Sequence, residues 1–351
     1  MIKGTAKTEA QYRAVKLNSS SSLKDFSMDR KKYYKKYVKG ETVEEKENHA
    51  ANMGRIVETL LLEPEEFEGR FYMSTCSSVP TGLMLEFVEA LYRCSKEATD
   101  ENGIVTRSFE TISTDAYILS GFKIKYEGVL GKFINSEAEM YYNEIRKVRA
   151  NKLTVITAQD VTNAEKIVEE LKTNSVTAKV INLVNSSRYT ILNQLQIEGF
   201  TIDGLELKGM LDKVIIDHDK KTILPIDLKC TWSVENFYEE YYLYRRAYIQ
   251  AYLYYQAIVH LANDITNEFY GYTVYNLQFL VCDSTNYMNP IIYTLSNEDM
   301  GDCYLGFEHK GKTYPGVKSI IEDLQWAMDN DVWNISRVNH TLNGQVNIKG
   351  T

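Results

Sequence analysis

The stretch that decides the fold is Gly209-Met-Leu-Asp-Lys-Val-Ile-Ile-Asp-His-Asp-Lys-Lys-Thr-Ile-Leu-Pro-Ile-Asp-Leu-Lys-Cys230. Two apolar runs flank its polar middle, residues 217–222, a pattern typical of a β-hairpin. A turn at the centre of this polar segment places Asp212 directly opposite Asp227. Directly opposed Cβ atoms lie roughly 4.5–5.5 Å apart, and like charges in that position are destabilising. The sequence therefore predicts two carboxylates whose repulsion a bound divalent cation would relieve.

Lys229 completes a set of charged residues on the predicted hairpin. It lies two residues beyond Asp227, so on a strand both side chains point to the same face. Two carboxylates and an ammonium are the minimum equipment for metal-dependent phosphodiester cleavage. We expect Asp212, Asp227 and the backbone carbonyl of Leu228 to bind Mg²⁺, with Mn²⁺ as the alternative ion, because hard cations prefer oxygen ligands. Lys229 would lie beside the attacking water or neutralise charge on the phosphate; the alternative is a surface ion pair.

Three further regions supply candidate site residues. Glu58 precedes an apolar run within a predicted helix, where an exposed acid would be badly placed. We interpret Glu58 as a catalytic residue and third metal ligand. The alternative is that it pairs with a neighbouring arginine. Gln250 and Tyr254 are one helical turn apart and share a face, from which they could bind the DNA backbone or orient the site. The alternative is that Gln250 is an exposed residue without a role. Arg245 and Arg246 are candidate phosphate contacts, with a solvated face as the alternative.

Composition excludes several classes of protein. No apolar stretch reaches the roughly 18 residues of a transmembrane helix, and the N-terminus lacks the apolar core of a signal peptide, so we expect a cytoplasmic protein without a membrane partner. The five cysteines show no Cys-x-x-Cys spacing, which argues against an iron–sulfur cluster. The segment Gly128 to Lys132 has the wrong spacing for a phosphate-binding loop, so no nucleotide cofactor is expected.

The charge is distributed unevenly along the chain. The net charge is −8, yet residues 1–48 hold twelve Lys and Arg against seven Asp and Glu. This basic segment is either a solvated helix face or a set of phosphate contacts. We expect it to be a helical elaboration preceding a single domain over 49–351.

The rest of the pattern predicts an α/β fold, a central mixed sheet flanked by helices. Its core motifs are expected at 54–63 and 205–295. The predicted strands are 189–197, 205–216, 223–230, 276–282 and 290–294, and the predicted helices include 47–62, 157–171, 234–261 and 316–328.

Several motifs, taken in this order, resemble the PD-(D/E)XK nuclease superfamily. They are the opening Ser21-Ser-Leu-Lys24 with Asp29-Arg-Lys-Lys-Tyr33, the segment Gly54 to Glu68, Gly209-x-x-Asp212, Asp227-x-Lys229-x-Thr231, the Gln250/Tyr254 pair, and Gly316-Val-Lys with Trp326. The likeness is greatest to phage-type recombination exonucleases of the RecE and lambda-exonuclease kind, which include the RecB-type nuclease domain. It covers most of the chain and implies a restriction-endonuclease-like core. It also adds Thr231 to the candidate substrate-binding residues.

This resemblance implies a DNA exonuclease that degrades linear duplex ends 5′→3′ for homologous recombination. It implies a ring-like homo-oligomer, a single-strand-annealing recombinase or single-strand-binding protein as partner, and a phage or prophage gene expressed in a bacterial host. Many relatives carry histidine where this chain has Glu58, which leaves open whether one or two metal ions bind. The alternatives are a structure-selective or defence-related endonuclease of the same superfamily and a catalytically inactive DNA-binding module.

Overall fold

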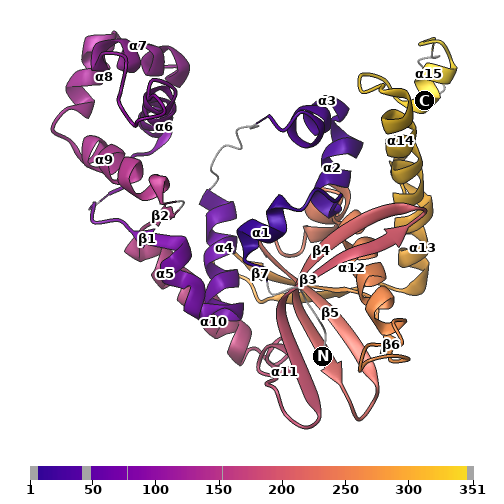
Figure 1. Ribbon diagram of the computed structural model, residues 1–351. Helices are drawn as coiled ribbons and strands as arrows, with labels where there is room; N and C mark the ends of the chain where they lie inside the picture. The colour runs from indigo at the N-terminus through magenta and orange to yellow at the C-terminus, as the bar shows by residue number, and fades with distance from the viewer. Residues whose placement is uncertain (1–6, 42–48, 77, 152, 346–351) are drawn as a thin grey trace. The chain divides into compact units, whose positions relative to one another are not determined.

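The computed structural model describes residues 7–41, 49–76, 78–151 and 153–345 (Figure 1). Its chain divides into two compact units, Met1–Leu62 together with Lys166–Thr351, and Glu63–Glu165. The boundary expected after residue 48 is therefore not a division of the structure. The physical reason is that Leu23 and Phe26, in the N-terminal segment, are buried in the same hydrophobic core as the sheet.

The larger unit is built on a six-stranded mixed sheet with the order β3-β4-β5-β7-β8, in which β6 also pairs with β5. Neighbouring strands are antiparallel except where β5 runs parallel to β6 and β7. This arrangement confirms the expected α/β fold with a central mixed sheet and helices around it. The strands are β3 (Tyr189–Ile202), β4 (Leu205–Asp217), β5 (Thr222–Thr231), β6 (Thr273–Val274), β7 (Gln278–Asp283) and β8 (Ile291–Thr294).

The hairpin of β4 and β5 has the register that the sequence predicts. Asp217 pairs with Thr222 and Lys213 pairs with Ile226. The ladder ends at this last pair, and just beyond it the Asp212 carboxylate accepts a hydrogen bond from the Leu228 backbone N–H. The hairpin forms because Val214, Ile216 and Ile223 all enter the core, and a shift of one residue would turn every one of these side chains to the other face.

Helices pack on this sheet and place side chains near the hairpin. In the larger unit α12 (Ala247–Ala262) lies against β3, β4 and β5 (Figure 1), and α4 (His49–Leu62) contacts β4 and β5. Helix α2 (Ser20–Met28) begins at a capping box made by Ser19 and Ser22 and contacts α12. The other elements are α1 (Glu9–Ala14), α3 (Arg30–Tyr33), η1 (Tyr34–Val38), α11 (Ala178–Ile181), η3 (Tyr238–Tyr244), α13 (Asn297–Leu305), β9 (Gly306–His309), β10 (Lys312–Pro315), α14 (Val317–Asn330) and α15 (Arg337–Thr341).

The single long helix expected over 234–261 is wrong. The chain forms a π-helix over Tyr238–Tyr244 and then restarts as α12. Between them Arg246 adopts φ 54° and ψ 43°, a left-handed conformation that ends a helix and is costly for a residue with a Cβ atom. The Arg246 guanidinium donates a hydrogen bond to the Ser27 carbonyl at 2.8 Å, so a contact with α2 helps to hold this break.

The smaller unit is mainly helical and has its own core. Phe87, Leu91, Phe133 and Ile145 are among its buried side chains. Its elements are η2 (Pro64–Glu66), α5 (Phe67–Arg70), β1 (Phe71–Met73), α6 (Gly82–Glu97), α7 (Phe109–Ser120), α8 (Tyr126–Phe133), α9 (Glu137–Ala150) and β2 (Thr154–Ile156), with β1 and β2 parallel; α10 (Ala158–Thr173) spans the boundary between the units. None of the helices within the described ranges is long and apolar enough to cross a membrane.

Candidate active site

The centre of the site is the carboxylate of Asp227, which is fully buried on β5. It forms an ion pair with the Lys229 ammonium, and its Oδ1 accepts a hydrogen bond from Gln250 Nε2 at 2.7 Å. The Lys229 side chain keeps 21% of its exposure, and its Nζ lies 3.4 Å from the Leu228 carbonyl oxygen. Burial lowers the pKa of Lys229, but the charges of Asp227, Asp212 and Glu58 outweigh it and raise the pKa overall. Lys229 therefore stays protonated at neutral pH.

Asp212 lies on β4 beside this pair. Its Oδ2 accepts a hydrogen bond from the Leu228 backbone N–H at 2.7 Å, which fixes its side chain to the opposite strand of the hairpin. Burial raises the pKa of Asp212 well above its ordinary value, and the charges of Asp227 and Glu58 raise it further. Burial and these charges therefore both favour the protonated form of the Asp212 carboxyl group.

Glu58, on α4, belongs to the same group of charges, since it acts on the pKa of both Asp212 and Lys229. Its Oε1 accepts a hydrogen bond from Gln194 Nε2 at 2.6 Å. Gln194 has φ 49° within β3, a left-handed conformation that is unusual away from glycine. Nothing in the sequence marks Gln194, because its role depends on a local backbone distortion and on a helix 136 residues away.

Gln250 and Tyr254 share one face of α12, as their spacing predicts, and each is only 8% exposed. The alternative of an exposed Gln250 is therefore wrong. Burial raises the pKa of Tyr254, and the neighbouring charges of Asp227 and Asp212 add to the increase. Both side chains consequently face the acidic pair.

Lys24, on α2, is a residue near the acidic pair to which the sequence analysis gave no role. Its Nζ donates a hydrogen bond to Gln250 Oε1 at 2.9 Å. Burial and the charge of Lys229 lower the pKa of Lys24 to about 7, against the opposing influence of Asp227 and Asp25. The motif Ser21-Ser-Leu-Lys24 was the available signal, but it does not show where the lysine points.

The remaining candidate residues lie in different environments. Thr231 is buried, and its hydroxyl accepts a hydrogen bond from the Ser233 backbone N–H at 3.3 Å. Arg246 binds the Ser27 carbonyl, as described above. Arg245 is exposed, with its guanidinium 4.3 Å from the centroid of the Tyr241 ring. Of these three, Arg245 has the accessibility that a phosphate contact requires.

The donor set suits a hard divalent cation, although no ready-made cage is present. Within the part of the chain that the structure describes, no group of three or more His, Cys, Asp and Glu side chains is arranged to hold a metal ion. Asp212, Asp227 and the Leu228 carbonyl nevertheless offer oxygen atoms on adjacent strands. Mg²⁺ is usually held by one or two carboxylates and keeps several of its waters. Burial, and after it the charges of Asp227 and Glu58, raise the pKa of Asp212, and a bound cation would stabilise its ionised form.

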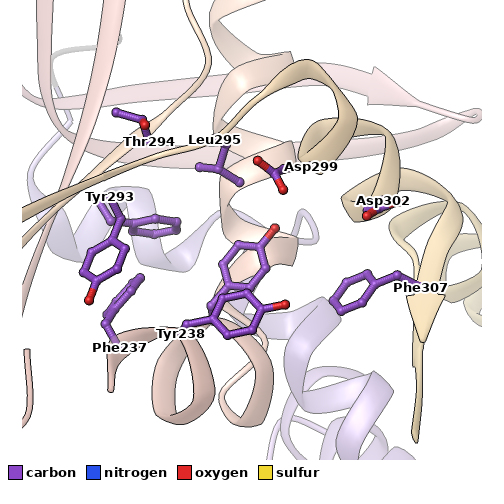
Figure 2. Close-up of a pocket in the computed structure, with 10 residues that line it drawn as sticks. Phe237, Tyr238, Tyr293, Thr294, Leu295, Asp299, Asp302 and Phe307 are labelled. Atoms are coloured by element: carbon purple, nitrogen blue, oxygen red, sulfur yellow. The ribbon is translucent and has the colours of Figure 1, made fainter. Parts of the chain in front are cut away.

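Cavities do not mark this centre. A cavity of 110 Å³ lies elsewhere in the larger unit, lined mainly by aromatic side chains with Asp299 and Asp302 beside them (Figure 2). None of the predicted site residues lines it. A much smaller hollow of 10 Å³ is bordered by Asp212, Lys213 and Leu228. A buried ionisable group with a shifted pKa, such as Asp212, is a candidate for a functional site.

No protein family model and no curated protein matches this chain. Among solved structures, it is similar to the crystal structure of a protein from Eubacterium rectale named "Putative exonuclease", with a TM-score of 0.46 and 12% sequence identity. The alignment covers 99% of this chain and 95% of that chain. A likeness at this level identifies neither a family nor an activity, so the chemistry has to be derived from the site residues.

Proposed function

We propose that this protein is a metal-dependent deoxyribonuclease of the PD-(D/E)XK type. The observation that carries the proposal is the convergence of Asp212, Asp227 and Lys229 on one hairpin, with Gln250 held against Asp227. A purely structural ion pair would need only one carboxylate for Lys229. The second, repelled carboxylate is costly for stability, and such a cost is typical of sites that function requires.

Asp212, Asp227 and the Leu228 carbonyl would hold the metal, with Glu58 as the additional acid. When bound, Mg²⁺ would polarise the scissile phosphate and lower the pKa of an attached water. Lys229 remains protonated at neutral pH, because the surrounding carboxylates raise its pKa. It therefore acts as a positive charge that stabilises the transition state rather than as a base. Gln250 orients the carboxylate of Asp227 by donating to its Oδ1.

For the substrate, we propose linear duplex DNA whose ends are degraded 5′→3′, on the basis of the sequence motifs. Arg245 and the basic segment 1–48 would contact phosphates, which contribute a salt-dependent share of affinity. The same motifs support a homo-oligomer that works with a single-strand-annealing or single-strand-binding partner in a bacterial cytoplasm. These features of substrate and assembly rest on the motifs, whereas the chemistry rests on the site.

The test is digestion of linear duplex DNA labelled at either the 5′ or the 3′ end, in separate reactions with Mg²⁺. We expect early release of the 5′ label, and no release when a chelator removes the metal. Lys229→Ala and Asp227→Ala should abolish release, whereas Asp219→Ala should not, because Asp219 is an exposed acid at the turn of the same hairpin. Activity that survives Lys229→Ala would refute the site.

A covalently closed circular duplex tests the mode of cleavage. An exonuclease leaves this circle intact because it offers no end. Cleavage of the circle by the purified protein would replace the exonuclease with an endonuclease that uses the same residues. Absence of cleavage on every DNA, together with no metal binding by calorimetry, would favour a non-catalytic binding module.

A further inference from the structure

We infer that Lys24 is a positioning residue of this centre, which fixes the orientation of Gln250 and through it the carboxylate of Asp227. The inference deepens the proposed function and rests on it for its catalytic consequence. It extends the site to helix α2 in the N-terminal segment. The three side chains form one chain of hydrogen bonds, from Lys24 Nζ to Gln250 Oε1 at 2.9 Å and from Gln250 Nε2 to Asp227 Oδ1 at 2.7 Å.

Both ends of this chain select the same orientation of the Gln250 amide, which has one donor end and one acceptor end. The Asp227 carboxylate accepts from the amide nitrogen, and Lys24 Nζ donates to the amide oxygen. Without Lys24 the amide would be held at the Asp227 end alone, and the Gln250 side chain could swing about that single contact.

The placement of Lys24 is costly unless it serves the site. Its ammonium faces the like charge of Lys229, and burial together with that charge disfavours its protonated form. Among the described residues, Gln250 is the side chain to which the Lys24 Nζ is found to donate a hydrogen bond. A lysine placed only for stability would more readily pair with a carboxylate at the surface.

Several contacts hold the helix that carries Lys24. Leu23 and Phe26, which flank Lys24 on α2, are buried in the core. The Ser27 carbonyl accepts a hydrogen bond from Arg246, and Arg30, on the following helix α3, forms an ion pair with Asp323. The position of the Lys24 backbone is thus determined by contacts that do not involve its own side chain. Replacing that side chain should leave the helix in place.

The experiment compares Lys24→Met, Lys24→Arg and the control Lys318→Met in the full-length protein. Lys318 is an exposed lysine on α14, outside the site. The first readout is the side-chain amide signal of Gln250 in protein labelled with ¹⁵N-glutamine, assigned by its loss in Gln250→Ala. We expect Lys24→Met to shift this signal, Lys24→Arg to retain most of the wild-type shift, and Lys318→Met to have no effect.

The second readout is the rate of nucleotide release. Misplacing a catalytic group by about 1 Å costs on the order of 100-fold in rate, so we expect Lys24→Met to lower kcat by about 10- to 100-fold and to change KM by about twofold or less. Lys24→Arg should recover part of the loss. An unchanged Gln250 signal in Lys24→Met would overturn the inference, as would a wild-type kcat.

The two proposals can fail separately. If the wild-type protein releases no nucleotides, the proposed function fails, while the Gln250 signal still decides whether Lys24 positions the amide. If the wild-type protein is active and Lys24→Met matches it in both readouts, the nuclease stands and the role of Lys24 is refuted.

Discussion

Replacing Asp212 by asparagine should make the folded protein more stable while removing its activity. Asparagine has almost the same shape as aspartate, and its amide oxygen can still accept the hydrogen bond from the Leu228 N–H. The substitution removes the negative charge that faces Asp227 and Glu58. It therefore separates the electrostatic cost of the acidic pair from its packing.

The size and the pH dependence of this gain follow from the site. Like charges on neighbouring strands are destabilising, and a gain of about 1 kcal/mol would correspond to a Tm change of about 2–4 °C in a mid-sized domain. The pKa of Asp212 is raised on folding, so the folded state binds its proton more tightly than the unfolded state does. The destabilisation by ionised Asp212 thus develops as pH rises above its ordinary pKa. The gain from Asp212→Asn should be present at pH 8 and disappear in acid.

Magnesium should reverse the order of stabilities. For a dissociation constant of about 1 mM, 10 mM Mg²⁺ would stabilise the wild-type protein by about 1.4 kcal/mol. Asp212→Asn should lose most of this increment because it lacks one of the two carboxylates. The assay is thermal unfolding by circular dichroism at pH 8, with and without Mg²⁺, beside nucleotide release. A variant that is less stable than wild type without metal, or that gains as much from Mg²⁺, would refute the reasoning.

Four substitutions test further features. Lys229→Met should abolish activity and lower the free energy of unfolding by about 3 kcal/mol, because it leaves the buried carboxylate of Asp227 without its ion pair. Equal stability of the variant and the wild-type protein in urea unfolding would contradict this ion pair. Lys24 has a pKa of about 7 in the folded protein and 10.5 ordinarily, so between these values the unfolded state binds its proton more tightly. The free energy of unfolding of the wild-type protein should therefore rise relative to that of Lys24→Met between about pH 7 and 10. Parallel profiles of unfolding free energy against pH would be evidence against the burial of Lys24. Gly316→Ala should destabilise the fold by about 2 kcal/mol or more, since a Cβ atom there would collide with backbone atoms of Tyr304 and Gly306. Gly301→Ala on α13 meets open space and should stabilise the fold by about 0.5–1 kcal/mol. The opposite order of stabilities in urea unfolding would contradict this packing.

Helix and strand positions were predictable where a local pattern dominates. The closing helix expected over 316–328 is observed as Val317–Asn330, because its apolar residues recur at helical spacing. The helix predicted over 157–171 is observed as Ala158–Thr173, and Thr157 and Asp160 cap its start through reciprocal hydrogen bonds at 2.9 and 3.1 Å. The break at Arg246 was not predictable, since the residues around it are good helix formers and the contact with Ser27 comes from another part of the chain.

The amino-acid sequence by itself determined the hairpin and its register from Lys213 and Ile226 to the turn. These depend on alternation and on turn length over about twenty residues, which short-range physics controls. Tertiary structure alone decided that Lys24 meets Gln250, 226 residues away, and that Gln194 meets Glu58. The packing of the helices on the sheet determines these contacts. No periodic pattern in the sequence predicts which group a single polar side chain will contact.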